Sequence, residues 1–242
     1  DRAKRASAPH RQRAFGGGSK ALLGTAMQQF VFILVYWKVY PTQDVHGVLF
    51  DMAQPTANKW VHRLQSVLEA TLKEELVFPE RPRVTTMAEL WALCPELECV
   101  IDGTERPIRR PRDPEKQTEC YSGKKKRHTV KNTIVTEKKT KRILFVGATH
   151  PGKVHDKKAA DQDAIPFPSG SRLYQDTGYQ GYQPVGVETW QPKKKPRNKN
   201  LTDEEKAENT RISRERIGVE HSIGGAKTFR IVSDVFRNRK PG

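Results

Sequence analysis

Apolar residues recur at helical spacing over residues 21–72, and two interruptions divide this segment into three predicted helices. Pro41 and Thr42 interrupt the first run, and residues 52–55 interrupt the second. The third helix has Pro55 near its first turn, where a missing N–H costs no intrahelical hydrogen bond. The pattern therefore predicts a small all-helical unit over residues 21–77.

The third predicted helix separates an apolar face from a polar, basic face. The inner face is predicted to consist of Trp60, Val61, Leu64 and Val67. The outer face would then carry Asn58, Lys59, His62 and Arg63. A short helix, a tight turn and a second helix with basic exposed residues is the helix-turn-helix pattern that reads the major groove of DNA. On spacing alone, a helical bundle with solvated charges remains the alternative.

Beyond residue 78 the pattern changes to short β-branched runs. Residues 78–96, rich in Pro, Glu and Thr, are predicted to be a linker. Consecutive antiparallel strands are then predicted at 99–108, 128–137 and 142–150, a short helix near 155–162, further strands at 171–179 and 185–192, and two helices within 201–225. This order predicts an α/β catalytic domain over 97–242, a ribonuclease-H-like mixed sheet flanked by helices and preceded by the helix-turn-helix domain.

The charge of the chain indicates a polyanionic partner. Lys and Arg number 44 against 28 Asp and Glu, giving a formal charge of +16 and a pI near 9.9. Nucleic acid is the expected partner, and we expect residues 1–20 to form a flexible basic arm. No apolar run is long enough to span a bilayer. The cysteines indicate neither a disulfide framework nor a zinc site. Because Asp1 stands where a Met is expected, we expect a fragment of a longer protein.

Two acidic residues follow short apolar runs. Asp102 follows the run 99–101 and precedes Gly103, while Asp176 follows Leu173 and Tyr174. A run of this kind is typical of a strand buried on both faces, and a carboxylate placed there needs a partner or a metal ion. The two carboxylates are therefore expected to lie side by side.

A third acid lies on a predicted helix over residues 213–227. Glu220 shares a face with Arg216 and Lys227, and we expect Gly224 and Gly225 to allow close packing beside it. Three carboxylates on two strands and a helix could hold two hard cations about 4 Å apart for phosphodiester chemistry. Taken singly, each acid is more commonly part of a turn, a cap or a salt bridge.

Several ordered blocks of the sequence resemble one family. They are IDGTERPI with Asp102, the segment Tyr121 to Lys125, PGKVHDKKAAD, YQDTGYQGY with Asp176, and the spaced trio Arg216, Glu220 and Lys227. Together these blocks resemble the IS-five-type insertion-sequence transposases and their eukaryotic PIF/Harbinger relatives, which share a DDE endonuclease domain. One departure is Ser213, which stands where the family has a Tyr.

The resemblance implies a DNA transposase that cleaves transposon ends and transfers them to target DNA. Asp102, Asp176 and Glu220 would be its catalytic, metal-binding residues, holding two Mg²⁺ ions for which Mn²⁺ could substitute. The partners would be double-stranded transposon-end and target DNA, with a homo-oligomer assembled on it and no membrane. The protein would be cytoplasmic and nucleoid-associated in a bacterium, or nuclear in a eukaryote. The alternatives are a domesticated, non-cleaving DNA-binding module and a plain metal-dependent nuclease.

The basic residues and one further acid complete the expected site. Arg216 and Lys227 are expected to hold phosphates, and the run Lys193 to Lys199 could grip flanking DNA. The DNA backbone would be followed by Lys124, Lys125, Lys126, Arg127 and Lys131. Asp156 is an alternative second acid, but it precedes a predicted helix, so we interpret it as a structural helix cap.

Overall fold

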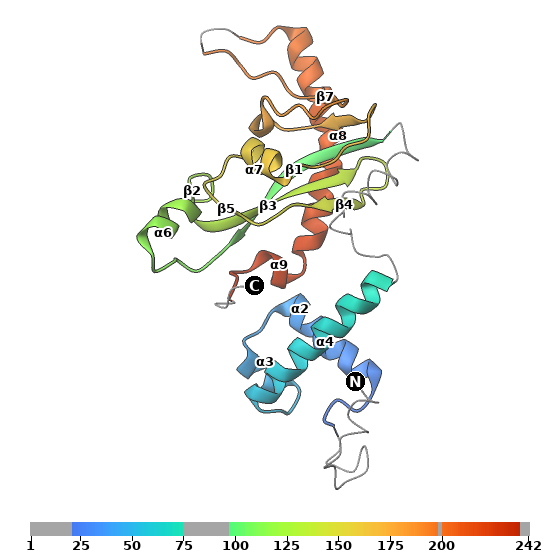
Figure 1. The fold of residues 1–242 in the computed structure, drawn as a ribbon, viewed down its shortest axis with the longest axis vertical. Helices are drawn as coiled ribbons and strands as arrows, with labels where there is room; N and C mark the ends of the chain where they lie inside the picture. The colour runs from blue at the N-terminus through green and yellow to red at the C-terminus, as the bar shows by residue number, and fades with distance from the viewer. Residues whose placement is uncertain (1–20, 75–96, 198–199, 238–242) are drawn as a thin grey trace. The chain divides into compact units, whose positions relative to one another are not determined.

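The computed structural model describes residues 21–74, 97–197 and 200–237, and the chain divides into two compact units, Asp1–Ala70 and Thr71–Gly242 (Figure 1). The predicted basic arm at 1–20 and the predicted linker at 78–96 lie outside the described residues.

The described part of the first unit consists of the helices α2 (Ala26–Val39), α3 (Gln43–Leu49) and α4 (Gln54–Glu74). Thr25 and Gln28 form a reciprocal capping box that starts α2. Tyr40 ends α2 in the left-handed region, and the hydroxyl of Thr42 accepts the N–H of Val45 at the start of α3. The interruption at Pro41 and Thr42 is thus the predicted helix boundary, and the three predicted helices are confirmed.

The core of the first unit lies where α4 crosses α2. Ala57, Val61 and Leu64 of α4 are buried against Phe32 and Ile33 of α2. The prediction that Val67 lies on the inner face is wrong, because Val67 is 56% exposed and Leu68 packs on the core instead. Spacings of four, three and four residues from Ala57 to Leu68 keep one helical face, whereas Val67 is rotated away from it.

The second unit is built on a mixed sheet. Its antiparallel part consists of β1 (Glu98–Pro107), β3 (Arg127–Glu137) and β4 (Ile143–Val146), as predicted. The short strands β2 (Tyr121–Ser122) and β5 (His150–Pro151) also pair with β3. On the other side, β6 (Arg172–Tyr174) is parallel to β1, and β7 (Glu188–Trp190) is parallel to β6.

Among the described residues of the second unit, the helices are α6 (Pro114–Cys120), α7 (Asp156–Asp163), α8 (Asp203–Lys227) and α9 (Arg230–Ser233), with the 3₁₀ turn η1 (Thr177–Tyr179). The prediction of two helices within 201–225 is wrong, because α8 is one helix of 25 residues that starts at a capping box on Thr202. Each interior glycine costs about 1 kcal/mol of helix propensity. The helix nevertheless continues because Ile212, Val219 and Ile223 are buried against the sheet.

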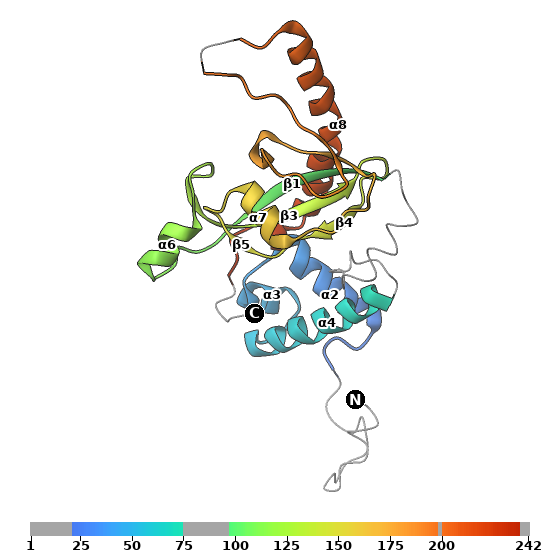
Figure 2. The same cartoon turned by 45° about the horizontal axis from the view of Figure 1, so that its top comes forward.

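Alternating residues of β1 pack on opposite faces of the sheet. Cys99 and Ile101 join a core with Leu173, Tyr179 and Ala160 of α7. Val100 joins the core formed with α8. Figures 1 and 2 show α7 and α8 on the two sides of the sheet. The unit therefore has the predicted ribonuclease-H-like arrangement, a mixed sheet covered on both faces.

In the part of the chain that the structure describes, no helix is both long enough and apolar enough to cross a membrane.

Candidate active site

The pairing of β1 with β6 brings Asp102 and Asp176 side by side. Val100 of β1 is in register with Tyr174 of β6, where the parallel pairing ends. Asp102 comes two residues after Val100, and Asp176 comes two residues after Tyr174. Both aspartates therefore lie just beyond the last pair, at the same position along the two parallel segments. The sequence suggested that Asp102 lies at the end of its strand. Asp102 instead lies within β1, because this strand continues to Pro107 beside β3.

Asp102 is a half-buried carboxylate in an acidic neighbourhood. Its Oδ1 accepts a hydrogen bond from the N–H of Gly103 at 2.8 Å. Desolvation by the surrounding protein raises the pKa of Asp102, and the charges of Asp176 and Asp156 raise it further. The hydrogen bond from Gly103 and the charge of Arg216 act in the opposite direction. Asp102 is thus an acid whose negative charge is incompletely balanced by the protein.

Asp176 sits at the start of η1 with a more open side chain. Its Oδ1 accepts the N–H of Thr177 at 2.6 Å, and Arg216 Nη1 lies 3.6 Å from the same oxygen. The side chain of Arg216 is only 12% exposed, against 40% for Asp176. Arg216 therefore reaches from α8 into the acidic site and partly balances its charge.

Helix α8 brings two cations, Arg216 and Lys227, near this site. Arg216 precedes Glu220 by one turn, and Lys227 follows it by two turns; both cations interact electrostatically with Asp102. Burial lowers the pKa of Lys227, and the nearby charge of Lys125 lowers it further. Glu220 itself is exposed, and it shares a hollow of about 440 Å³ with Arg216.

The glycine pair beside Glu220 does not make the close contact expected of it. A Cβ atom added to Gly224 or Gly225 would meet nothing within 4 Å. The expectation of close packing there is wrong, because both glycines lie on an exposed face of α8 rather than against the sheet.

Asp156 has a different environment from the one expected of a helix cap. The N-cap of α7 is His155, which makes no side-chain cap hydrogen bond, and Asp156 is the first residue of the helix. Its Oδ1 lies 2.7 Å from Nζ of Lys131. Sequence reasoning missed this ion pair, since β3 and α7 are brought together only by the folded sheet.

The basic residues predicted to contact DNA divide into two groups. Residues 124–126, in the turn before β3, and Arg127, the first residue of β3, are exposed. Among them, Lys125 lies within electrostatic range of Lys227 and hence near the acidic site. Lys131 differs: its side chain is only 9% exposed and pairs with Asp156, so it does not present a free charge on this surface.

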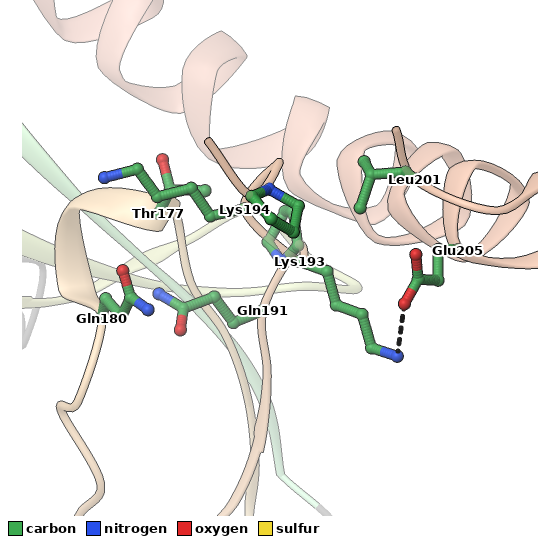
Figure 3. A pocket seen from close by; sticks show the side chains of 9 residues that line it. Thr177, Gln180, Gln191, Lys193, Lys194, Leu201 and Glu205 are labelled. Carbon is green, nitrogen blue, oxygen red and sulfur yellow. Dashed lines mark hydrogen bonds and ion pairs between the residues drawn. The ribbon is translucent and has the colours of Figure 1, made fainter. Parts of the chain in front are cut away.

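A depression of about 500 Å³ lies next to Asp176 (Figure 3). It is bounded by Thr177 and Gln180 of η1, Gln191 and Lys193 after β7, and Glu205 of α8. Lys193 Nζ pairs with Glu205 at 3.2 Å, and Gln191 donates a hydrogen bond to the main-chain carbonyl of Asp176 at 2.6 Å. The first part of the basic run 193–199 thus borders the candidate site.

In the helical unit, the predicted outer residues of α4 are arranged unequally. Lys59 and Arg63 are exposed, and the guanidinium of Arg63 lies 5.3 Å from the Trp60 ring centroid. Asn58 is partly buried and donates a hydrogen bond to Gln43 of α3 at 2.9 Å. Asn58 therefore ties α3 to α4, whereas Lys59 and Arg63 project into solvent.

Comparison with known proteins identifies the family. Residues 101–241 match the model of the DDE superfamily endonuclease domain, which covers more than half of the chain. The chain belongs to the DDE superfamily endonucleases. Residues 22–74 match the helix-turn-helix of the same superfamily. The predicted helix-turn-helix domain and DDE endonuclease domain are thereby confirmed.

A curated relative agrees with this assignment. The chain is 30% identical over 211 residues to a protein of Microchaete diplosiphon described as a probable transposase for insertion sequence element IS702; the match covers 87% of this chain and 73% of the relative. No solved structure matches the chain. The prediction of an insertion-sequence DDE transposase, a DNA-binding enzyme, is confirmed. The IS-five-type and PIF/Harbinger subtype stays a prediction.

The DDE superfamily endonucleases depend on divalent metal ions. Asp102, Asp176 and Glu220 offer carboxylate oxygens, which fit hard divalent cations in their chemistry. Within residues 21–74, 97–197 and 200–237, no three acidic, His or Cys side chains are close enough together to hold a metal ion. The arrangement of the described residues therefore brings two of the expected acids together and leaves Glu220 apart from them.

Proposed function

We propose that this DDE superfamily endonuclease cleaves phosphodiesters at transposon ends and transfers them to target DNA with Asp102, Asp176 and Glu220. The observation that carries the proposal is the β1–β6 register, which sets Asp102 beside Asp176 while Arg216 reaches them from α8. The bound ions would be two Mg²⁺, for which Mn²⁺ can substitute, and they would supply an activated water and stabilise the entering and leaving oxygens.

The charge distribution around Asp102 supports this proposal. Its raised pKa reflects a desolvated carboxylate with two acidic neighbours, and such a group gains stability when a cation binds. Glu220 lies on α8 between two cationic residues that both interact with Asp102, which supports its assignment as the third acid. The acids would bind the ions, and Arg216 and Lys227 would hold phosphate oxygens.

The surrounding basic surface would orient the DNA. Lys125 and Lys193 lie near the acidic site, and residues 124–127 would follow the DNA backbone beside the scissile bond. Lys59 and Arg63 of the helix-turn-helix would contact the transposon end. Because cleavage and joining involve two transposon ends, we propose a homo-oligomer assembled on DNA, in the nucleoid of a bacterium or the nucleus of a eukaryote.

The test is cleavage of a labelled duplex carrying the element's terminal repeat, with Mg²⁺, by the full chain and by Asp102→Asn, Asp176→Asn and Glu220→Gln. Each change should reduce cleavage by at least about a hundredfold with DNA affinity unchanged, since metal binding rather than DNA contact is removed. Glu204→Gln, which removes an exposed acid at the start of α8, is the matched control and should cleave normally.

Equal cleavage by the control and the three variants would reject the triad. Binding without cleavage by the unaltered chain would favour the non-cleaving module, and cleavage without strand transfer would favour the plain nuclease.

A further inference from the structure

We propose that Asp156 is a positioning residue that fixes the separation of Asp102 and Asp176, an inference that rests on the proposed function of those two acids. Asp156 is itself outside the triad, and its carboxylate lies against the chain segments that follow both aspartates.

The contacts of Asp156 with two glycines carry this inference. A Cβ atom on Gly103 would lie 3.1 Å from Asp156 Oδ1, and one on Gly178 would lie 2.9 Å from Asp156 Oδ2. Gly103 directly follows Asp102, and Gly178 is two residues after Asp176. The carboxylate of Asp156 therefore fills the space between the two backbone segments, one oxygen facing each. A side chain at either glycine would push against the carboxylate of Asp156 and displace it.

Lys131 holds this carboxylate from the sheet. Its Nζ lies 2.7 Å from Asp156 Oδ1, and the side chains of Lys131 and Asp156 are 9% and 29% exposed. Lys131 belongs to β3, in register with Glu105 of β1. The pair thus connects the first residue of α7 to the strand beside Asp102, and the lysine balances a negative charge that would otherwise add to the repulsion within the site.

Tyr179 also borders the space beside Gly103. Its side chain is 1% exposed, and its hydroxyl would lie 3.6 Å from a Cβ atom on Gly103. Among the residues that the structure describes, no hydrogen-bond partner faces this hydroxyl. A rigid aromatic ring and a charge-paired carboxylate therefore enclose Gly103, which leaves the backbone beside Asp102 little freedom to move.

The alternative is that Asp156 and Lys131 form an ion pair with a structural role only. Removing one partner would leave a buried unpaired charge, and the resulting damage could not be assigned to either role. Two double variants avoid this difficulty. Asp156→Asn with Lys131→Met removes both charges and keeps the shape of the side chain between the glycines. Asp156→Ala with Lys131→Met removes both charges and the shape.

The first measurement is Mn²⁺ affinity of the full chain without DNA, by isothermal titration calorimetry, followed by cleavage rate and DNA affinity. The Asn double variant should stay within about threefold of the unaltered chain. The Ala double variant should lose about tenfold or more in Mn²⁺ affinity and in cleavage, as groups that orient metal ligands do when removed. DNA affinity should be the same in both. Equal Mn²⁺ affinity in the two double variants would overturn the proposal.

A second pair of variants covers the case in which the Ala double variant does not fold. Gly178→Ala would push against Asp156 Oδ2, whereas Gly224→Ala places its Cβ in open space. Mn²⁺ affinity should fall in the first and remain unchanged in the second, and an unchanged affinity in Gly178→Ala would also overturn the proposal. The proposed catalytic triad has its own test, because full cleavage by Asp102→Asn and Asp176→Asn would reject the triad whatever the role of Asp156.

Discussion

Asp102 carries a charge that the fold around it disfavours. The carboxylate is half-buried, and its acidic neighbours Asp156 and Asp176 raise its pKa further after desolvation has raised it. A 2.8 Å hydrogen bond from Gly103 and the charge of Arg216 oppose this effect. A group of this kind lowers stability in the absence of its cation, and active sites commonly store such a conflict.

Replacing Asp102 with Asn should therefore stabilise the metal-free protein at neutral pH, by on the order of 1 kcal/mol. The pKa of Asp102 is raised in the folded protein, so the ionised carboxylate destabilises the fold at neutral pH. The extra stability of the Asn variant should vanish near pH 4 and below, where Asp102 is protonated in both the folded and the unfolded protein. Thermal unfolding in the presence of a chelator measures this difference in stability. Saturating Mn²⁺ should make the unaltered protein the more stable of the two, because metal binding stabilises the protein with Asp102 and not the Asn variant. A lower melting temperature of the variant at pH 7 would contradict this account.

At the scale of elements, the helical unit is organised around a buried histidine. His46 of α3 is fully buried, with its ring centroid 4.2 Å from that of Phe32 and 5.0 Å from that of Phe50. Desolvation lowers its pKa. The aromatic contacts hold α3 against α2, and the neutral imidazole is the form compatible with that packing.

The stability of the helical unit should consequently fall as the pH drops below about 6.5, by up to about 1.4 kcal/mol per pH unit. The pKa of His46 is lowered in the folded protein, so below about pH 6.5 the unfolded chain takes up a proton on His46 that the folded chain does not. Urea unfolding can be followed by the fluorescence of Trp37 and Trp60, with Trp91 and Trp190 replaced by Phe. His46→Leu should abolish this pH dependence, and His62→Leu, at an exposed position of α4, should preserve it. The same slope in both variants would contradict the role of His46.

At the scale of the molecule, exposed lysines gather in the turns at both ends of β3. The exposed turn before this strand contains Lys124 and Lys125, and Lys125 is within electrostatic range of Lys227. The turn at the opposite end of β3 contains the equally exposed Lys139 and Lys141. The chain therefore offers two basic turns of similar charge, only one of which borders the acidic site.

Neutralising Lys124 and Lys125 together should flatten the salt dependence of DNA binding. Each phosphate contact contributes about 0.9 to the slope of log affinity against log salt concentration, so the double alanine variant should lose about 1 to 2 from that slope. Lys139→Ala with Lys141→Ala is matched in charge and should leave the slope near its original value. Fluorescence anisotropy over a salt series measures both, and an equal loss in the two variants would indicate a diffuse field rather than a defined DNA path.

Much of this protein follows from local sequence pattern. The three helices of the first unit follow from helical spacing and the breaks at residues 41–42 and 52–55, and the meander follows from β-branched runs. The placement of Asp102 beside Asp176 was predicted for a local reason too, because each follows a short apolar run in the sequence. These features depend on the nearest residues, and a period or a turn signal is sufficient to indicate them.

The remaining features depend on which segments meet. Val67 and Leu68 are both apolar, and only the angle at which α4 packs decides that Leu68 is the inner residue. The single helix α8 continues past its glycines because the sheet buries its apolar residues. Asp156 has the local signature of a helix cap, yet Lys131, 25 positions earlier, pairs with it. Sequence thus indicated most of the elements and the candidate acids, whereas the tertiary structure decided their partners, because register and packing are set by contacts between distant segments.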